Sequence, residues 1–290
     1  MYLINLIKEE KKHHTVKMLC NLYQVPKSSF YERINRKESA RAKENKKLKN
    51  KISQIYEDSK KRYGAPKITK KMKRKGFKIS LKRTQRLMRE LDIRSITYRK
   101  FKYYSGKSNS NFKGRNLLKQ NFKTKKINEK WVTDITYIHT VNDGWCYLAS
   151  VMDLHTKKII GHVFDKHMKK ELVIRALRNA CKSQKIKKNN QILLHSDRGV
   201  QYTSKAYTKI AERKGFRLSY SDKGNPYDNA CIESFHSILK KEETKHNTYK
   251  NYKEAKLRIF KFIESWYNRK RIHSSINYMT PVEFERKCVA

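Results

Sequence analysis

The sequence predicts an α/β domain that follows small, all-helical modules. Residues 131–138 are rich in Thr, Val, Ile and Tyr, and the turn sequence at 142–144 (Asn-Asp-Gly) separates them from a similar run at 145–151, which together predict a β-hairpin. The short apolar run at 191–195 is typical of an interior strand. Helical patterns dominate the first 98 residues, so the sheet is expected to begin only after them.

The first 38 residues indicate two short helices. An apolar stripe at Val16, Leu19, Cys20 and Tyr23 precedes a break at Val25-Pro26, and a second short helix is expected through Phe30 and Ile34. This outline fits a helix-turn-helix that reads DNA, but an ordinary helical hairpin would have the same pattern.

Residues 44–98 are predicted to form a second module of the helix-turn-helix type. It has a long first helix, a Gly-Ala-Pro turn at 64–66 and a later helix capped by Ser80, whose inward positions are Thr84, Leu87, Met88 and Leu91. The opposite face of that later helix carries Lys82, Arg83, Arg86 and Arg89. A charged face is often merely solvated, but a face of single sign favours contact with DNA.

The rest of the chain is predicted to consist of a linker, a catalytic core and a helical tail. Residues 99–128 are basic and rich in Gly, Ser and Asn, which predicts a linker. A catalytic core is expected at 129–250 and a helical tail at 251–290. The tail should contain a helix over 252–268 and a last helix that starts at Thr280-Pro281.

Three acidic residues are the candidate catalytic groups. Asp134 falls in the middle of a predicted strand, where a buried carboxylate needs a cation, a hydrogen-bonding shell or a proton. Asp197 follows a predicted strand, at the end where α/β sheets commonly place their ligand sites. Glu233, separated from Asp197 by 35 intervening residues, lies on a helix for which Asp228 is a plausible N-cap, and it shares a polar face with His236, Ser237 and Lys240.

These three acids could bind a divalent cation together. Each of them alone is more simply read as a cap, turn or surface residue, but their joint context favours a common site. An all-oxygen set of ligands suits Mg²⁺ or Mn²⁺ rather than zinc. The five cysteines include no Cys-X-X-Cys pair, which argues for a reducing compartment, and His13, His14 and Cys20 lack a further cysteine at zinc-ligand spacing.

Charge points to a polyanionic partner. The chain has 71 Lys and Arg against 26 Asp and Glu, a formal net charge of +45, which would attract phosphate backbones to much of its surface. Charge alone does not separate DNA binding from binding to RNA or the ribosome. No stretch approaches the apolar length of a membrane span, and the apolar start is too short for a signal peptide. We expect a cytoplasmic protein that associates with the nucleoid.

The motifs resemble those of the OrfB-type DDE transposases of the IS-three insertion-sequence family, which are relatives of retroviral integrases. The resemblance runs from about Leu19 to Phe284. It includes the contexts of the three acids, the upstream motif ArgTyrGlyAlaProLysIle at 62–68, and the motif TyrAsnArgLysArgIleHisSerSerIleAsnTyrMetThrPro at 267–281. It implies an RNase H-like core with a mixed five-stranded sheet flanked by helices.

The resemblance also implies a mechanism. Two Mg²⁺ or Mn²⁺ ions per active site, about 3.5–4 Å apart, would be held by Asp134, Asp197 and Glu233. Water would first free a 3′-OH at the element end, and that hydroxyl would then attack a phosphodiester of target DNA. Lys240 matches a family position expected to contact DNA near the reacting phosphate. Arg271 and His273 match the C-terminal motif, where a structural role is an equal alternative to DNA contact.

Two other functions remain open from the sequence alone. An RNase H-like nuclease would hydrolyse DNA without joining it, and a non-catalytic DNA-binding regulator of transposition would carry an inactive core. The family resemblance further implies a homo-oligomer on double-stranded DNA and a partner encoded in an upstream frame, joined by frameshifting.

Overall fold

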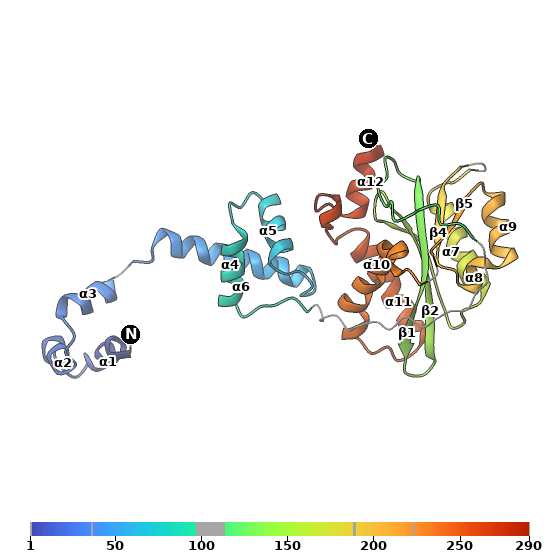
Figure 1. Cartoon of the computed structure of the whole chain (residues 1–290). Coiled ribbons are helices and arrows are strands. Elements are labelled where there is room, and N and C mark those ends of the chain that lie inside the picture. Colours follow the sequence, from blue (N-terminus) through green and yellow to red (C-terminus); the bar gives the residue numbers. More distant parts are fainter. Residues whose placement is uncertain (1, 36, 97–113, 188–189, 223, 290) are drawn as a thin grey trace.

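The chain forms two helical modules and one larger α/β domain (Figure 1). The structure is a computed structural model that describes residues 2–35, 37–96, 114–187, 190–222 and 224–289. The part of the predicted linker that covers 99–113 lies outside these described residues. No helix in the described ranges is long and apolar enough to cross a membrane.

The N-terminal module contains the two expected helices and one more. Its helices are α1 (Tyr2–Glu10), α2 (Val16–Leu22) and α3 (Lys27–Asn35). Ile7 from α1, Leu19 and Cys20 from α2, and Phe30 from α3 are all buried in a small core. The sequence indicated α2 and α3 by their apolar stripes, and α1 adds a third side to the same core.

The second module is a three-helix unit: α4 (Ala40–Asp58), α5 (Ala65–Arg74) and α6 (Leu81–Glu90). The cap at Ser80 is confirmed, because its hydroxyl accepts the N–H of Arg83 at 3.1 Å. The expectation of a simple turn at Gly-Ala-Pro was incomplete. Pro66 lies in the first turn of α5, where its missing N–H costs nothing, and Ile68 and Met72 of that helix are buried.

A five-stranded mixed sheet forms the α/β domain, in the order β3-β2-β1-β4-β5. Its strands are β1 (Lys130–Thr140), β2 (Gly144–Asp153), β3 (Ile159–Asp165), β4 (Leu193–Ser196) and β5 (Arg217–Tyr220). The hairpin between β1 and β2 is confirmed, and Gly144 at its turn has a φ of +67°, a value that glycine adopts without strain. Strand β4 runs parallel to β1, and β5 runs parallel to β4.

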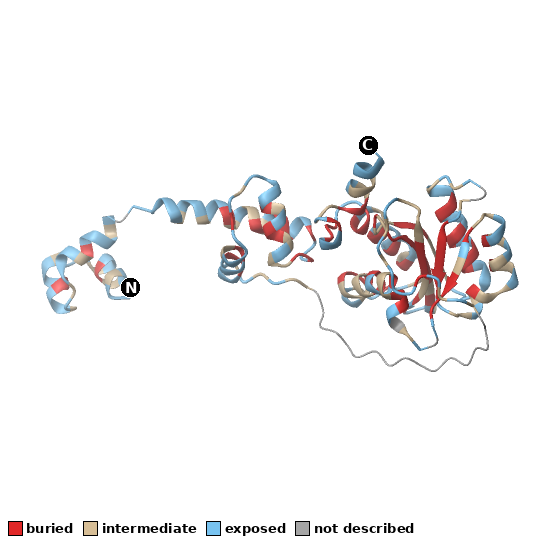
Figure 2. Cartoon of the chain, turned by 45° about the horizontal axis from the view of Figure 1, so that its top comes forward, coloured by how far each residue is buried: buried red, intermediate tan, exposed pale blue. Residues whose placement is uncertain are grey.

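Helices cover both faces of this sheet (Figures 1 and 2). One face packs against α7 (Lys170–Ser183), α8 (Val200–Thr203) and α9 (Lys205–Arg213). The other packs against α10 (Ala230–Glu242), preceded by the 3-10 turn η1 (Pro226–Asn229), and against α11 (Tyr252–Lys261) with its π-helical extension η3 (Phe262–Tyr267). Shorter 3-10 turns are η2 (Thr244–His246) and η4 (Ser274–Ile276).

The C-terminal tail follows the prediction. The helix expected over 252–268 is α11 continued by η3, and its apolar side is buried. The last helix, α12 (Pro281–Val289), begins with a reciprocal capping arrangement: the N–H of Glu283 donates to the Thr280 hydroxyl at 3.2 Å, and the N–H of Thr280 donates to the Glu283 carboxylate at 2.8 Å.

The second module and the tail meet at the C-terminal end of α10. Arg62 donates to the carbonyl of Glu242 at 3.0 Å and to the carboxylate of Glu243 at 2.5 Å. The Tyr63 hydroxyl donates to the carbonyl of Lys270 at 2.9 Å and accepts the N–H of Ile272 at 3.0 Å. The upstream motif at 62–68 and the C-terminal motif at 267–281 are therefore in direct contact.

Residues 114–128 pack on the α/β domain, although the sequence assigned them to the linker. Leu118 is buried, and the N–H groups of Leu117 and Leu118 donate to the Ser219 hydroxyl of β5 at 2.9 and 3.1 Å. Backbone pairing continues this contact, since the N–H of Tyr220 donates to the carbonyl of Arg115 at 3.0 Å. The low apolar content that suggested a linker is compensated by these hydrogen bonds to the sheet edge.

Candidate active site

Asp134 and Asp197 lie at the same level on adjacent strands. Val132 of β1 pairs with His195 of β4 in the parallel ladder, and each aspartate comes two residues after its paired neighbour. Because side chains two apart share a face of a strand, this register directs both carboxylates to the face that α10 covers. Strand β4 ends at Ser196, so Asp197 lies at the carboxyl end of its strand, as predicted.

The two carboxylates repel one another. The Asp197 side chain reaches solvent, yet neighbouring protein atoms remove much of its hydration, and this burial together with the charge of Asp134 raises the pKa of Asp197 to about 6. The N–H of Gly199 donates to Asp197 at 3.0 Å and opposes the shift. Asp134 accepts the N–H of Ile135 at 2.8 Å, but no positive side chain of the described residues neutralises the pair fully.

Glu233 completes the group from the first turn of α10. Burial and then the charges of Asp134 and Asp197 raise the pKa of its carboxyl. One turn later, Nδ1 of His236 lies 3.4 Å from Oδ2 of Asp134, and the Nε2 atom of this buried histidine has no partner in the described structure. The polar helix face expected from the sequence thus points to the strand that carries Asp134.

The three carboxylates come from β1, from the residue after β4 and from α10 of the α/β domain. Within the described ranges, no group of three or more His, Cys, Asp or Glu side chains is arranged closely enough to hold a metal ion. The chemistry of the donor set, three carboxylates with two raised pKa values, fits a divalent cation.

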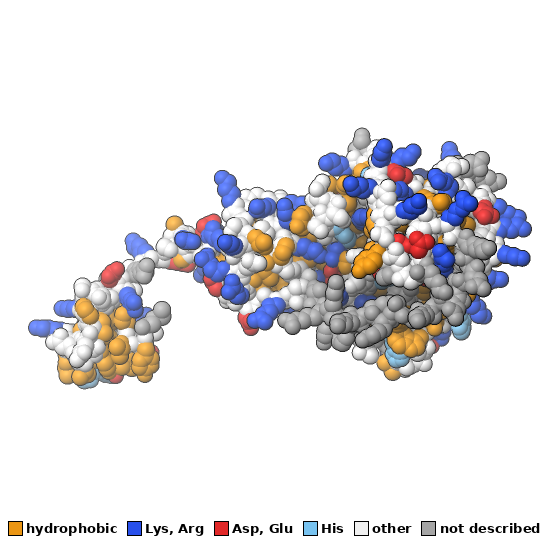
Figure 3. Space-filling model, viewed as in Figure 1, with side chains coloured by type: hydrophobic (Ala, Val, Ile, Leu, Met, Phe, Trp, Pro, Cys, Tyr) orange, Lys and Arg blue, Asp and Glu red, His pale blue; other side chains and the backbone are white. Residues whose placement is uncertain are grey.

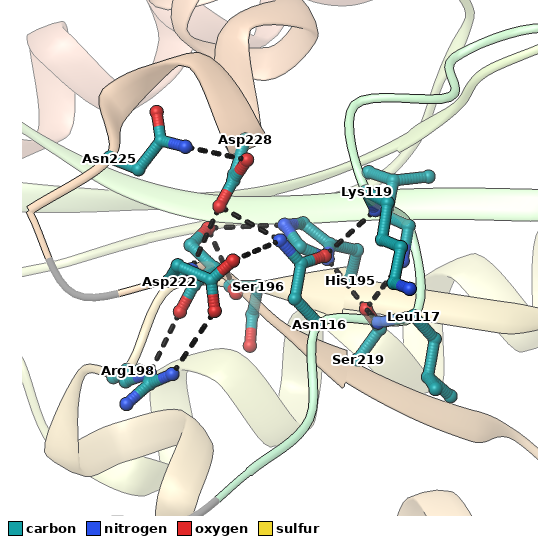
Figure 4. Close-up of polar contacts among 12 residues, drawn as sticks. Asn116, Leu117, Lys119, His195, Ser196, Arg198, Ser219, Asp222, Asn225 and Asp228 are labelled. Carbon is teal, nitrogen blue, oxygen red and sulfur yellow. Dashed lines mark hydrogen bonds and ion pairs between the residues drawn. The ribbon is translucent and has the colours of Figure 1, made fainter.

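The loop before α10 is fixed by a buried carboxylate, Asp228 (Figure 4). It accepts the N–H of Asp222 at 2.8 Å and side-chain amides of Asn116, Gln120 and Asn225 at 2.9, 3.0 and 3.2 Å. The prediction that Asp228 caps α10 was wrong, since Asn229 occupies the N-cap position and Asp228 lies inside η1. Its role is to tie the loop to residues 114–128.

His195 belongs to the same buried region, two residues before Asp197. Its Nδ1 lies 2.8 Å from the Ser219 hydroxyl and its Nε2 lies 3.1 Å from the Ser221 hydroxyl. Burial lowers the pKa of His195 to about 4, so the ring is neutral and its two nitrogens are both satisfied by the serines. The histidine therefore fixes β5 beside the strand that leads to Asp197.

Lys240 lies beside the carboxylates, on the last turns of α10. Burial lowers the pKa of its ammonium and the charge of Asp134 partly restores it, so the two groups are near one another. The Nζ atom lies 4.6 Å from the ring centre of Tyr137 on β1. A positive charge that interacts with Asp134 is suitably placed to contact a phosphate that binds there.

The predicted DNA-binding face of α6 is mostly, but not wholly, free. Lys82, Arg86 and Arg89 are exposed. Arg86 approaches Glu90 at 3.5 Å, one turn away. Arg83 is instead held by α4: its guanidinium donates to the Glu44 carboxylate at 2.7 and 3.1 Å and to the Asn45 side chain.

Arg271 and His273 are buried, which favours the structural alternative for both. The Arg271 guanidinium contacts the Glu242 carboxylate at 2.9 and 3.0 Å, and Trp266 donates to the same carboxylate at 2.9 Å. Burial raises the pKa of Glu242, but Arg271 and the other donors outweigh it and hold the pKa below its ordinary value. The His273 ring packs edge-to-face on Tyr267, and burial lowers its pKa to about 2.

Comparisons with known families agree with this architecture. An integrase core domain family matches residues 124–226, a second integrase core domain family matches residues 214–281, and an HTH-like domain family matches residues 43–101. Among solved structures, the chain is similar to the catalytic core domain of HTLV-2 integrase, with a TM-score of 0.42 and 14% identity over 59% of this chain and 99% of that one.

Relatives of known name match over nearly the full length. The transposase of insertion sequence IS904 of Lactococcus lactis is 36% identical over 87% of this chain and 99% of its own length. The transposase InsF of insertion sequence IS3A of Escherichia coli K12 is 33% identical over 98% of both chains. With an integrase-type sheet, three interacting carboxylates and these relatives, the chain belongs to the transposase family of IS3-type insertion sequences.

Proposed function

We propose that this chain is a DNA transposase that cuts the ends of its insertion sequence and joins them to target DNA by direct, metal-dependent phosphoryl transfer. Asp134, Asp197 and Glu233 form the catalytic centre. The observation that carries the proposal is the register of β1 and β4, which brings two carboxylates together at a cost that a bound divalent cation would offset.

The three carboxylates would hold Mg²⁺ or Mn²⁺, two ions per site. Such ions supply activation of the attacking oxygen and stabilisation of the leaving 3′ oxygen. Asp134 and Asp197 are fixed by the sheet, whereas Glu233 is exposed on the first turn of its helix and can approach a cation by changing its rotamer. A site with two rigid ligands and one adjustable ligand accepts substrates at successive steps of one reaction.

The products of the two steps determine which bonds form and which break. In the first step water attacks the phosphorus at the element end, the bond to the 3′ oxygen breaks, and a 3′-OH is freed. In the second step that hydroxyl attacks a target phosphodiester, one new phosphodiester forms, and one target 3′ oxygen leaves. The number of phosphodiester bonds is unchanged in the second step, so no outside energy source is needed.

Contacts to the DNA backbone are assigned to Lys240 near the reacting phosphate and to Lys82, Arg86 and Arg89 on α6. These side chains are positive, and the α6 residues are exposed on one module. The net charge of +45 adds long-range attraction to DNA. Joining two ends to one target would require at least two copies of the chain, and a partner encoded in the upstream frame could supply further recognition of the ends.

The test uses the purified full chain with labelled element-end DNA and Mg²⁺, for the wild type, Glu233→Gln and Glu212→Gln. Glu212 is an exposed acid of α9, so its variant is the matched control. A joined product that requires metal and is lost only in Glu233→Gln supports the proposal. Nicked product without joined product would indicate a nuclease, and binding without either product would indicate a regulator or a missing partner.

A further inference from the structure

A group of exposed aromatic rings lies on the β1–β2 hairpin of the α/β domain. Tyr137 is 48% exposed and Trp145 is 54% exposed, and their rings pack edge-to-face at 5.2 Å between centroids. The ring of His139, also exposed, packs against Trp145 at 5.1 Å. We call these three rings, with the ammonium of Lys240 over Tyr137, the aromatic platform.

The position of the platform connects it to the carboxylates. Tyr137 lies three residues after Asp134 on the same strand, and this odd spacing turns the two side chains to opposite faces of the sheet. However, β4 pairs with β1 only as far as Val132, so this stretch of β1 has a free edge past which a side chain of α10 can reach Tyr137. Lys240 reaches across this region, close enough to Asp134 for their charges to interact and 4.6 Å from the Tyr137 ring. In Figure 3 hydrophobic and histidine side chains are visible together at the lower surface of the domain, below the sheet.

The platform is held rigidly. The hairpin tip is tied to the segment before α11, because the N–H groups of Val141 and Asn142 donate to the carbonyls of Tyr249 and Lys250 at 2.9 and 3.0 Å. The Asp143 carboxylate accepts the N–H of Tyr252, which fixes the other side of the turn. Rings that are held in place lose little conformational freedom when a flat ligand packs on them, which favours binding at this surface.

We propose that the aromatic platform stacks an unpaired DNA base within a few nucleotides of the phosphate that the carboxylates cut. A base offers the flat π-surface that exposed Tyr, Trp and His rings bind, and the ammonium of Lys240 attracts the phosphate beside it. This inference rests on the proposed function, because the carboxylates define which phosphate is involved. Separation of the terminal bases by stacking would also give the active site access to a backbone that a closed duplex constrains.

A double-mutant cycle between protein and DNA tests the proposal. The probe is a duplex of the element end with its flanking DNA, nicked at the boundary, in which single abasic sites replace each of the three nucleotides on either side of the cut. Dissociation constants are measured for wild type, Trp145→Ala, Tyr137→Ala and the conservative Tyr137→Phe. Phe260→Ala is the matched control, since Phe260 is an aromatic residue of α11 that is 52% exposed and belongs to another face.

Stacking predicts one position at which the abasic site weakens wild-type binding by roughly 5- to 100-fold, the range expected for one stacked base. Trp145→Ala and Tyr137→Ala should lose the same factor on intact DNA and nothing more on the abasic DNA. Tyr137→Phe, which keeps the ring, and Phe260→Ala should bind like wild type. Thermal melting checks that the variants, all at exposed positions, remain folded.

Unchanged DNA affinity in both alanine variants would overturn the proposal. So would losses of affinity that are the same on intact DNA and on DNA with an abasic site at any position. A loss of self-association with unchanged DNA affinity would also overturn it, and would assign the platform to protein contact. The cycle measures binding alone. Failure of the proposed function would instead appear as absence of joined product in the wild type, so the two failures are distinguishable.

Discussion

Asp134 and Asp197 each stand two residues beyond Val132 and His195, which are partners in the parallel β1–β4 ladder. Adjacent parallel strands with the same offset place like side chains next to each other, and the charge of Asp134 accordingly contributes to the raised pKa of Asp197. The α/β domain therefore holds two like charges close together. The free energy that their repulsion costs must be offset by the other contacts of the domain.

Arg271→Ala should destabilise the catalytic domain strongly. The substitution leaves the Glu242 carboxylate buried with fewer partners, and loss of one member of a buried ion pair typically costs about 3–5 kcal/mol. Urea unfolding followed by tryptophan fluorescence measures this, because all three tryptophans lie in this domain. Arg286→Ala, on the last helix, is the control. Unchanged stability together with weakened DNA binding in Arg271→Ala would support the DNA-contact alternative instead.

Arg62→Ala should loosen the contact between the second helical module and the catalytic domain. Arg62 contacts the carbonyl of Glu242, the carboxylate of Glu243 and the ring of Trp266, whose centre lies 4.8 Å from the guanidinium carbon. Removal of this side chain should speed hydrogen exchange of the backbone amides at the end of α4 and in η2, the two segments that the contact joins. Lys47→Ala on the exposed side of α4 provides the comparison. Equal exchange rates for wild type and Arg62→Ala would show that other contacts hold the module.

Gly161→Ala should disrupt the packing of β3 on α7. A Cβ atom at Gly161 would lie 2.5 Å from the carbonyl oxygen of Ala176 and 2.6 Å from the backbone nitrogen of Ala180, and backbone atoms cannot move aside easily. A loss of about 1–3 kcal/mol, the usual cost of overpacking, is expected in the free energy of unfolding. Gly64→Ala, whose added Cβ would meet nothing closer than 3.8 Å, should be nearly neutral. Similar effects of the two substitutions would contradict this packing.

His195 should contribute a loss of stability as the pH drops below about 6.5, opposite in sign to the contribution of Asp197, whose raised pKa favours the protonated folded state. Burial lowers the pKa of His195 to about 4, so the folded state keeps the ring neutral while the unfolded chain takes up a proton. The stabilising effect is fully present above the unfolded pKa of roughly 6.5 and is lost as the pH falls to about 4, for a total of up to about 3 kcal/mol. His195→Gln should flatten the profile over this window, whereas His13→Gln, at an exposed histidine, should not. If the free energy of unfolding changed with pH in the same way for His195→Gln and wild type, His195 would not be the source of this pH dependence.

The exposed residues of α6 should differ from Arg83 in their effect on DNA binding. Arg86→Ala and Arg89→Ala should each reduce the slope of log affinity against log salt by about 1, as expected for one lost phosphate contact. Arg83→Ala should leave that slope unchanged and lower the melting temperature, because its guanidinium is held by Glu44 and Asn45. If Arg83→Ala reduced the slope and Arg86→Ala and Arg89→Ala did not, the DNA would lie on a different face of the module.

Local patterns explain which parts of this structure the sequence could predict. The hairpin at Gly144, the strand before Asp197 and the helix that carries Glu233 each have a period or turn signal within about ten residues. The same is true of the caps at Ser80 and Thr280. Where neighbouring residues determine the element, the prediction and the structure agree.

Long-range partners explain what the sequence could not show. Asp228 has an ordinary capping pattern, and its actual partners Asn116 and Gln120 lie more than 100 residues away. The basic stretch around Asn116 has no apolar period, yet it is fixed by hydrogen bonds to β5. Arg271 lies in a basic loop whose composition is typical of DNA binding. Only the position of Glu242 in the structure shows that the charge of Arg271 is neutralised within the protein.

The rate of metal-dependent strand joining in isosteric variants tests the central claim most directly. Pre-cut element ends and target DNA are incubated with Mg²⁺ and the wild type, Asp134→Asn, Asp197→Asn, Glu233→Gln or the control Glu212→Gln. If the three acids form one centre, each of their variants should lose joining by roughly a thousandfold or more, as residues that act as a unit do, and the control should match the wild type. Joining at the wild-type rate by any of the three variants would contradict the claim that these carboxylates form the catalytic site.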